Sequence, residues 1–464
     1  MTPEEEGAGP SRGRLIAYGQ IVIPLAVIGL PVAIYIPPFY SETLGVDLAT
    51  VGFILMLARL SDVVTDPLIG RLSDRTRTRW GRRRPWILAG VPVMMVSAVM
   101  LFAPPGAVSA GYLLLWICAI YLGFTLITIP YGAWGAELAT EYHARNRITG
   151  SREIFLLAGL LIAVMLPIAG AYLAGEEGSS SSRAAMAPLA WFTVLLLPVC
   201  TFVLFRHVPE PRPHELRHVP FIDGVRKALK NGPFRLILIT SSLGALAGSI
   251  NASVAILFYA HLADIGRAGL LLILALFAAG VVGSPFWVAL GGKIGKHMAI
   301  VAAGSISMAA FACVPVVIYW VKPNAPELVF WCLLVITLLQ GLTIGAAPIL
   351  GQSIMADVVD LDTLRNGEQR TAFLFAFMSM VRKVFEAMGA GIALPVIAWM
   401  GFNPQSDQNA PTALFALLAM YCLVPLVLWL ASILVISRYP ITRERQARLR
   451  RALDRKLKRQ AAKG

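Results

Sequence analysis

Long apolar stretches separated by short polar segments dominate the chain of 464 residues. Each stretch is about 20 residues long, and an α-helix of that length crosses the roughly 30 Å hydrocarbon core of a bilayer. The stretches fall at residues 15–40, 48–72, 86–103, 111–137, 153–173, 189–205, 234–262, 268–290, 298–321, 328–356, 371–400 and 412–436. The pattern therefore predicts an all-α membrane protein with twelve transmembrane helices.

A polar stretch at residues 206–233 divides the predicted spans into two groups of six. We therefore predict two six-helix bundles. The predicted segments are a cytoplasmic N-terminal segment 1–14, a bundle 15–205, a cytoplasmic linker 206–233, a second bundle 234–437 and a basic cytoplasmic tail 438–464.

The two predicted bundles resemble each other at a constant offset of 218 residues. The matched pairs are Pro67 and Pro285, Gly123 and Gly341, Thr125 and Thr343, Pro130 and Pro348, Arg147 and Arg365, and Arg152 and Arg370. Parallel repeats of six helices are typical of transporters that bind substrate between two bundles near the membrane midplane. We interpret the two matched arginine pairs as a symmetric cytoplasmic gate.

Composition supports the membrane assignment. Apolar residues make up 57% of the chain and charged residues 14%, and the mean hydropathy is +0.70. These values exclude a soluble enzyme and a disordered scaffold. Because the basic residues are spread over many loops rather than gathered on one domain, we also predict no nucleic-acid partner.

The net charge of +14 is chiefly an orientation signal. When loops are assigned to alternate sides of the membrane, 34 of the 40 basic residues fall on one side and three on the other. The positive-inside rule then places both termini and the linker in the cytoplasm. The basic tail 438–464 is also expected to touch anionic lipid.

Charged residues inside the second predicted span need a functional reason. Arg59, Asp62 and Asp66 follow one another at spacings of three and four, so they share one face of a helix. Each intramembrane carboxylate costs about 2.5 to 3.5 kcal/mol, and two carboxylates one turn apart also repel each other. A monovalent cation between them would relieve the repulsion. The alternative is that Arg59 neutralises Asp62 and the cluster is structural.

The eleventh predicted span carries Arg382, Lys383 and Glu386, again at helical spacing. Together with the three charged residues of the second span, their formal charges sum to zero. We hypothesise that these charges pair between the two bundles and that the pairing changes as cation and substrate bind.

The loop that follows the second span has two interpretations. It contains Gly70, Asp74, Gly81 and Arg82 among many arginines. The two glycines permit a tight connection, and Asp74 is placed to bond neighbouring helix ends in one conformation, which indicates a cytoplasmic gate. The alternative is an anchor that only sets the orientation of the protein.

Two sequence segments resemble a known family. Residues 59–70 read Arg-Leu-Ser-Asp-Val-Val-Thr-Asp-Pro-Leu-Ile-Gly, and residues 80–86 read Trp-Gly-Arg-Arg-Arg-Pro-Trp. They are similar to the second helix and following loop of the glycoside-pentoside-hexuronide:cation symporters, the melibiose permease-like family within the major facilitator superfamily. The resemblance covers nearly the whole chain, and it implies that the two six-helix bundles form the major facilitator fold.

The resemblance implies roles for individual residues. Asp62 and Asp66 would hold a coupling Na+ or H+, with Thr65 and Thr125 beside the cation. Arg152 and Lys383 fall where the family has basic residues near the sugar.

The chain departs from the family where the sugar is bound. The family's sugar-binding acidic residues fall at Ala26 and Thr128, and its stacking tryptophan falls at Gly132, with Tyr131 and Trp134 nearby. A cavity without these carboxylates is a poor match for a galactoside. Sodium-coupled lysophospholipid symporters of the same branch keep the aspartate pair and have a more apolar cavity. For Tyr131 and Trp134, helix packing is the alternative to lining a cavity.

The sequence therefore predicts a monomeric, cation-coupled symporter of the cell membrane, plasma or inner, that moves a small organic solute by alternating access. A sugar or glycoside is favoured; the alternatives are an amphiphile such as a lysophospholipid, or a transporter-like sensor that transports nothing. The predicted substrate or coupling residues are Arg152, Lys383, Thr128, Tyr131, Trp134, Arg382 and Glu386.

An enzyme is not expected, because the sequence offers no nucleophile with an oriented base, no phosphate-binding loop and no metal-ligand set. We predict no cofactor and no metal beyond the coupling cation. The expected partners are the small-molecule solute and membrane lipid.

Overall fold

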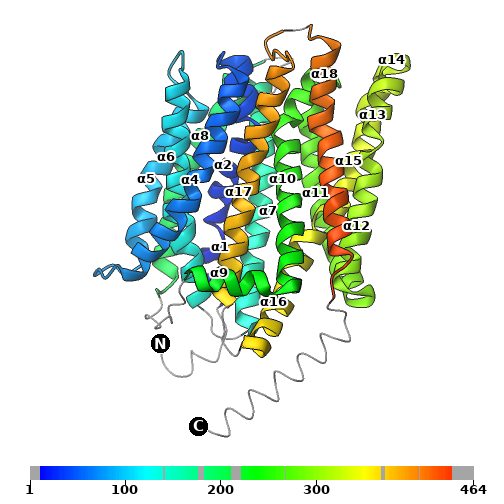
Figure 1. Cartoon of the computed structure of the whole chain (residues 1–464). Coiled ribbons are helices and arrows are strands. Elements are labelled where there is room, and N and C mark those ends of the chain that lie inside the picture. Colours follow the sequence, from blue (N-terminus) through cyan, green and yellow to red (C-terminus); the bar gives the residue numbers. More distant parts are fainter. Residues whose placement is uncertain are drawn as a thin grey trace, which may run out of the picture. The chain divides into compact units, whose positions relative to one another are not determined.

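The computed structural model describes residues 11–138, 142–175, 182–210, 221–266, 268–366, 371–406 and 408–440. Within these ranges the chain is helical almost throughout (Figure 1), apart from its loops and an isolated bridge between Thr78 and Gly81. The predicted all-α architecture is confirmed.

The first half of the chain forms long helices over the predicted apolar stretches. They are α1 (Arg12–Gly19), α2 (Val22–Ile34), α3 (Ile36–Pro38), the π-helical turn η1 (Phe39–Thr43), α4 (Leu48–Arg75), α5 (Arg84–Phe102), α6 (Ala110–Glu137), α7 (Tyr142–Leu173) and α8 (Arg183–His207). Helix α4 begins after Asp47, whose carboxylate accepts a hydrogen bond from the Thr50 amide at 2.8 Å. This is a side-chain cap of the kind that starts helices.

The second half continues in the same way. Its helices are α9 (Phe221–Lys230), α10 (Gly232–His261), α11 (Ala268–Ile294), α12 (Lys296–Phe311), α13 (Val314–Val316), η2 (Val317–Val321), α14 (Lys322–Asn324), η3 (Pro326–Leu328), α15 (Val329–Ile344), α16 (Ala346–Asn366), α17 (Thr371–Trp399), α18 (Pro411–Leu418), η4 (Ala419–Leu423) and α19 (Val424–Ile436).

Eleven helical stretches in the described part of the chain are long and apolar enough to cross a membrane. They correspond to the first ten predicted spans and to the last one. The remaining predicted span, 371–400, coincides with α17, a helix of 29 residues that is not among the eleven. It carries Arg382, Lys383 and Glu386. The total of twelve spans stays a prediction.

The chain divides into two compact units. The first contains Met1–His214, Ala252–Leu274 and Ala390–Leu417, and the second contains Glu215–Asn251, Ala275–Gly389 and Leu418–Gly464. The division passes through α10, α11 and α17. One end of each of these helices therefore belongs to the first unit, although all three follow the linker in the sequence.

Glycines bring the backbones of α5 and α6 close together in the first unit. A Cβ atom added to Gly90 would lie 3.2 Å from the Gly123 carbonyl oxygen, and one added to Gly123 would lie 3.1 Å from the Met94 backbone nitrogen. Lipid tails are as apolar as the helices, so the hydrophobic effect does not hold transmembrane helices together; close packing at small residues does.

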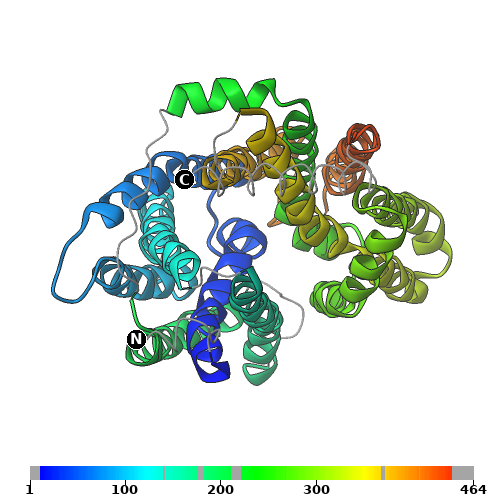
Figure 2. The same ribbon diagram turned by 90° about the horizontal axis from the view of Figure 1, so that it is seen from below.

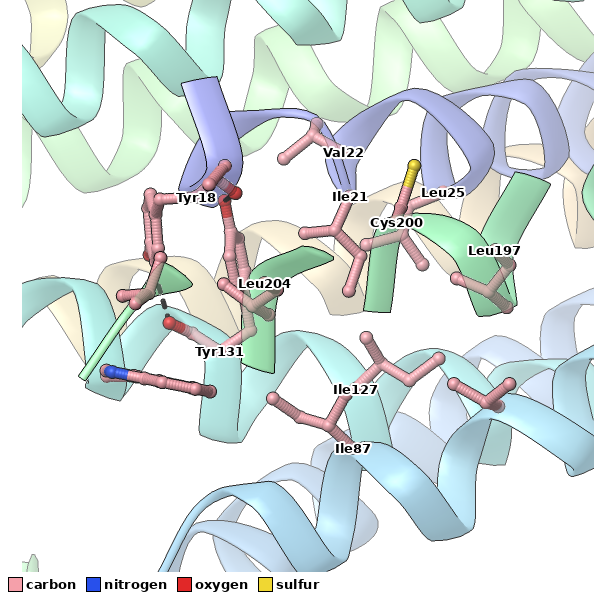
Figure 3. Packing of buried hydrophobic residues seen from close by; sticks show 14 of the residues in the cluster. Tyr18, Ile21, Val22, Leu25, Ile87, Ile127, Tyr131, Leu197, Cys200 and Leu204 are labelled. Carbon is pink, nitrogen blue, oxygen red and sulfur yellow. Dashed lines mark hydrogen bonds between the residues drawn. The ribbon is translucent and has the colours of Figure 1, made fainter. Parts of the chain in front are cut away.

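A buried apolar cluster joins six helices of the first unit, namely α1, α2, α5, α6, α7 and α8. Figure 3 shows part of it, with Ile21 and Leu25 on the first span, Ile87 on α5, Ile127 on α6 and Leu197 on α8. All five side chains are at most 5% exposed. The cluster fixes how α6 lies against its neighbours.

We expect Gly123→Leu to lower the free energy of unfolding by about 1 to 3 kcal/mol or more, and with it the melting temperature of the purified protein. The reason is that the added side chain overpacks the contact between α5 and α6. Gly244→Ala, at a position with open space on α10, serves as the control and should leave the melting temperature equal or slightly higher. Equal melting temperatures for both variants would show that the close contact does not stabilise the protein.

Candidate functional site

Helix α4 separates an apolar face from a charged face. Leu57, Val64 and Leu68 are exposed, and at 100° per residue they lie within about 40° of one another around the helix. Asp62 and Asp66 point about 140 to 180° away from them, and Asp62 is only 4% exposed. The carboxylates thus face protein while the opposite face offers apolar side chains to lipid.

Helix α6 supplies a partner for this charged face. Thr125 is 1% exposed, and its hydroxyl donates a hydrogen bond to Asp66 Oδ1 at 2.9 Å. Thr65 lies between the two aspartates in the sequence, and its buried hydroxyl forms no hydrogen bond to any described residue. The structure therefore brings Asp66 and Thr125 together, with Asp62 one turn away along α4.

Arg59, one turn before Asp62, lies against an aromatic ring. Its guanidinium carbon is 5.4 Å from the centre of the Tyr121 ring of α6. A cation over an aromatic face is stabilised by the ring quadrupole. This contact with α6 was not predicted from the sequence, because Tyr121 lies 62 residues away in an apolar stretch.

A second polar group in the first unit contains Arg152, Tyr131 and Tyr18. The two tyrosine rings stack at 4.4 Å, and each hydroxyl donates to the other residue's carbonyl oxygen, at 3.0 and 2.9 Å. Figure 3 shows the two side chains facing each other. The Arg152 guanidinium carbon lies 5.6 Å from the Tyr131 ring centre, and its buried Nε forms no hydrogen bond within the described residues.

Of the other predicted substrate residues on α6, Trp134 is fully buried, and its indole donates to the Pro209 carbonyl oxygen at 3.0 Å. Thr128 donates within its own helix, to the Phe124 carbonyl oxygen at 2.7 Å. Both side chains thus donate to backbone carbonyl groups, and their role toward the substrate stays a prediction.

The predicted charged residues of α17 belong to the second unit. Arg382 Nε lies 3.4 Å from Glu386 Oε1, one turn along the same helix. The Ser249 hydroxyl of α10 donates to the Glu386 carbonyl oxygen at 2.5 Å. Lys383 is half-buried on the same helix. The predicted charges thus lie on one turn of α17.

The loop between α4 and α5 contains an ion pair. Asp74 Oδ1 lies 2.6 Å from Arg83 Nη2, and Arg83 Nη1 donates to the Ser73 hydroxyl at 2.9 Å. The Arg83 side chain is 2% exposed. The predicted gate residue Asp74 therefore bonds the N-terminal end of the neighbouring helix α5. Its partner Arg83 was not singled out among seven nearby arginines.

Glu210, which follows α8, clamps the same loop. Its Oε1 accepts hydrogen bonds from the backbone amides of Arg82, at 2.5 Å, and Arg83, at 2.6 Å. Gly81 adopts a φ of +109°, and a Cβ atom there would collide with the Glu210 carboxylate. The glycine at position 81 is thus required both by its backbone conformation and by the approach of Glu210.

Two more contacts fasten the start of the linker to the first unit. Arg84 donates to the Val208 carbonyl oxygen at 3.1 Å, and Trp134 donates to that of Pro209. Gly70 lies within α4, one turn before Asp74. The loop, the end of α8 and residues 208–210 therefore form one connected polar cluster, on the side predicted to be cytoplasmic.

The predicted symmetric arginine gate is only partly covered by the described residues. Arg147 is exposed on α7, and Arg365 lies in the last turns of α16. Arg370 lies outside the described residues.

Asp357 of α16 forms a buried ion pair in the second unit. Lys296 Nζ at the start of α12 lies 2.6 Å from Asp357 Oδ2. The nearby Asp357 carboxylate adds to burial in raising the pKa of Tyr439 above its ordinary value. Sequence reasoning missed this pair, because it joins the first residue of α12 to a residue inside α16 that lies 61 positions away.

A further polar cluster lies at the other end of the first unit. His261 Nε2 is 3.1 Å from Glu42 Oε1, and the His261 ring meets the Phe402 ring edge-on at 5.3 Å between centres. Gln405 Nε2 donates to the Glu42 carbonyl oxygen at 3.4 Å. These contacts join η1 to segments that follow the linker in the sequence.

This helical fold, with a carboxylate pair inside one span, defines a membrane transporter. A family model described as MFS/sugar transport protein matches residues 17–443. The chain belongs to this family, which confirms the resemblance seen at residues 59–70 and 80–86. The family and the relatives are transporters, not enzymes, and the protein is a multi-pass symporter-type transporter of the cell membrane.

Named relatives cover almost the whole chain. It is 25% identical to the glucuronide carrier protein homolog of Escherichia coli (strain K12), over 88% of this chain and 88% of that protein. It is 23% identical to the sodium-dependent lysophosphatidylcholine symporter 1 of Mus musculus, over 93% of this chain and 86% of that protein.

Among solved structures, the crystal structure of the nucleoside transporter NupG aligns with a TM-score of 0.64 at 13% identity. The match covers 93% of this chain and 100% of that chain. At that identity the likeness shows the fold alone.

We expect Glu210→Ala to lower the free energy of unfolding by about 1.5 to 3 kcal/mol, because two backbone amides lose a charged acceptor. Thermal unfolding of the purified protein checks this, with Glu327→Ala, at an exposed glutamate of η3, as the control. If both variants melt with the wild type, the Glu210 carboxylate does not stabilise the loop.

Proposed function

We propose that the protein is a cation-coupled symporter that binds its cation between α4 and α6. The observation that carries the proposal is the hydrogen bond from Thr125 to Asp66, with the buried carboxylate of Asp62 one turn away. Two carboxylates in the hydrocarbon region are costly unless a positive charge joins them. Binding and release of a cation there changes the local charge by one unit, which is what coupling requires.

The ligand types favour Na+ over H+ as the coupling ion. A proton needs only one carboxylate oxygen, whereas Na+ is a hard cation that takes several oxygen ligands. Thr125 presents its oxygen beside Asp66, and Thr65 contributes a buried hydroxyl with no hydrogen-bond partner among the described residues. Asp62, Thr65, Asp66 and Thr125 together supply two carboxylates and two hydroxyls.

For the solute, we favour a sugar or glycoside recognised in part by Arg152. The Nε of Arg152 has no hydrogen-bond partner among the described residues, so it can donate to a hydroxyl or an acidic group of a ligand. Ala26, where the family has an acidic residue, is 5% exposed and packs on Gly159 of α7. A glycoside whose binding depends on a carboxylate at position 26 is therefore disfavoured.

An amphiphile such as a lysophospholipid is the second candidate solute. The replacement of the sugar-binding carboxylates by Ala26 and Thr128 leaves a more apolar surface, and the sodium-dependent lysophosphatidylcholine symporter is similar over almost the whole chain. Arg152 would also bind the zwitterionic headgroup of such a lysophospholipid. Arg382, Lys383 and Glu386 stay predicted coupling or substrate residues in both cases.

Alternating access is supported by reversible polar clusters at both ends of the first unit. At one end, Glu210 and Asp74 hold the loop after α4. At the other, Glu42 and His261 meet beside Phe402. Ion pairs and hydrogen bonds of this kind can break and re-form, as an opening and closing path requires.

We infer that the cytoplasmic gate also includes Gly70, Gly81, Arg82 and the arginines at 147, 365 and 370. We further infer that the monomer is the functional unit.

The test is thermal unfolding of the purified protein with sugars, glucuronides, other glycosides and lysophospholipids, each in NaCl and in choline chloride at equal ionic strength and at two pH values. A true ligand at one hundred times its dissociation constant should stabilise the protein by about 2.7 kcal/mol. We expect the stabilisation to be larger in NaCl. A protein that transports nothing and only senses would show no increase with either cation.

The same assay tests the cation site. We expect Asp62→Asn and Asp66→Asn to abolish the Na+ increment, and uptake into proteoliposomes to lose its dependence on a Na+ gradient. Thr125→Val should weaken Na+ binding without abolishing it. Thr193→Val, at a buried threonine that bonds its own helix on α8, is the control. Uptake by Asp62→Asn that still follows the gradient would remove Asp62 from the coupling site.

A further inference from the structure

Helix α9 is a short amphipathic element attached to the first turn of a membrane-spanning helix. It ends at Lys230, and only Asn231 separates it from α10, which begins at Gly232. Asn231 is buried; its carbonyl oxygen accepts from the Arg235 amide at 3.0 Å, and its amide donates to the Ala228 carbonyl oxygen at 3.0 Å. Because a single residue spans less than 4 Å, α9 lies at the same level as the end of α10.

The orientation of α9 is fixed by its own unit. Ala228 is fully buried in a cluster that includes Phe234 of α10 and Leu374 of α17. Gly224 is buried, and a Cβ atom there would lie 2.6 Å from the Phe373 ring. Figure 1 shows α9 running across the direction of α10 and α16, and Figure 2 shows it at the margin of its unit.

The face of α9 turned away from the protein is basic. Arg226, Lys227 and Lys230 are exposed, and at 100° per residue they occupy an arc of about 100° on one side of the helix. With Asp223 counted, α9 carries a net charge of +2. Leu229, at one edge of this arc, is 40% exposed.

We propose that α9 binds anionic phospholipid headgroups of the cytoplasmic leaflet, with its basic arc on the phosphates and Leu229 at the boundary with the acyl chains. The cytoplasmic side follows from the distribution of basic residues. That leaflet is negatively charged and attracts basic segments next to spans, and a helix with a basic face and an apolar edge lies in the membrane interface. The packing on α10 and α17 presents the arc before any lipid arrives, so lipid binding needs no folding of the linker.

The experiment compares the full-length protein in mixed micelles containing phosphatidylcholine alone or with one fifth phosphatidylglycerol. We expect phosphatidylglycerol to raise the melting temperature of the wild type, and expect this increment to shrink as choline chloride is increased from 50 to 500 mM. The triple variant Arg226→Gln, Lys227→Gln, Lys230→Gln should lose at least half of the increment. The charge-conserving pair Lys227→Arg, Lys230→Arg should keep it.

A matched control removes three exposed arginines from another cytoplasmic loop, as Arg75→Gln, Arg77→Gln, Arg79→Gln. This variant has the same net charge as the α9 variant and should keep most of the increment. An equal loss in both triple variants, or an increment that the α9 variant retains in full, would overturn the proposal. The second result would leave the basic arc to an acidic protein partner. Neither result bears on the cation site, because the Na+ concentration is kept constant, the ionic strength is varied with choline chloride and no solute is added.

Discussion

A charge placed in hydrocarbon must find compensation within a few ångströms, and this constraint organises the whole molecule. The bilayer leaves one orientation open to α4: exposed Leu57, Val64 and Leu68 on one side, and the carboxylates turned toward protein on the other. Helix α6 provides this compensation: Thr125 donates a hydrogen bond to Asp66, and the Tyr121 ring lies against the Arg59 guanidinium. The contact that packs α4 on α6 is therefore also part of the cation site proposed at Asp62 and Asp66.

The same constraint limits how helices can bind one another. Apolar side chains gain little by leaving lipid for protein, so the close contacts lie where side chains are smallest, as between Gly90 and Gly123. Where the backbone hydrogen bonds of a helix are irregular, polar side chains can bond the backbone groups. In the π-helical turn η4, the Tyr421 carbonyl oxygen accepts a hydrogen bond from Asn251 of α10 at 2.8 Å. Asn251, a polar residue inside a predicted span, thus donates a hydrogen bond to a backbone carbonyl group.

Much of this architecture could be predicted from the sequence, because hydrophobic length and charge position are local properties. The spans follow from the length of the apolar stretches, and the shared face of Asp62 and Asp66 follows from the helix period. The contacts of Glu210 with the amides of residues 82 and 83 could not be predicted. They join a side chain to backbone groups more than 120 positions away, and any acceptor of the right length would serve. The pairing of Tyr18 with Tyr131 left no pattern for the same reason.

The linker is anchored at both described ends, and this matters for anyone who wishes to modify the protein. Residues 208–210 are bonded into the first unit through Arg84, Trp134 and the amides before α5. Residues 221–230 pack onto the second unit through Ala228. A reporter domain, a protease site or a break that divides the gene into two co-expressed halves must therefore leave residues 208–210 and 221–230 intact. A junction inside either of these two segments would cut into one of the two folded units.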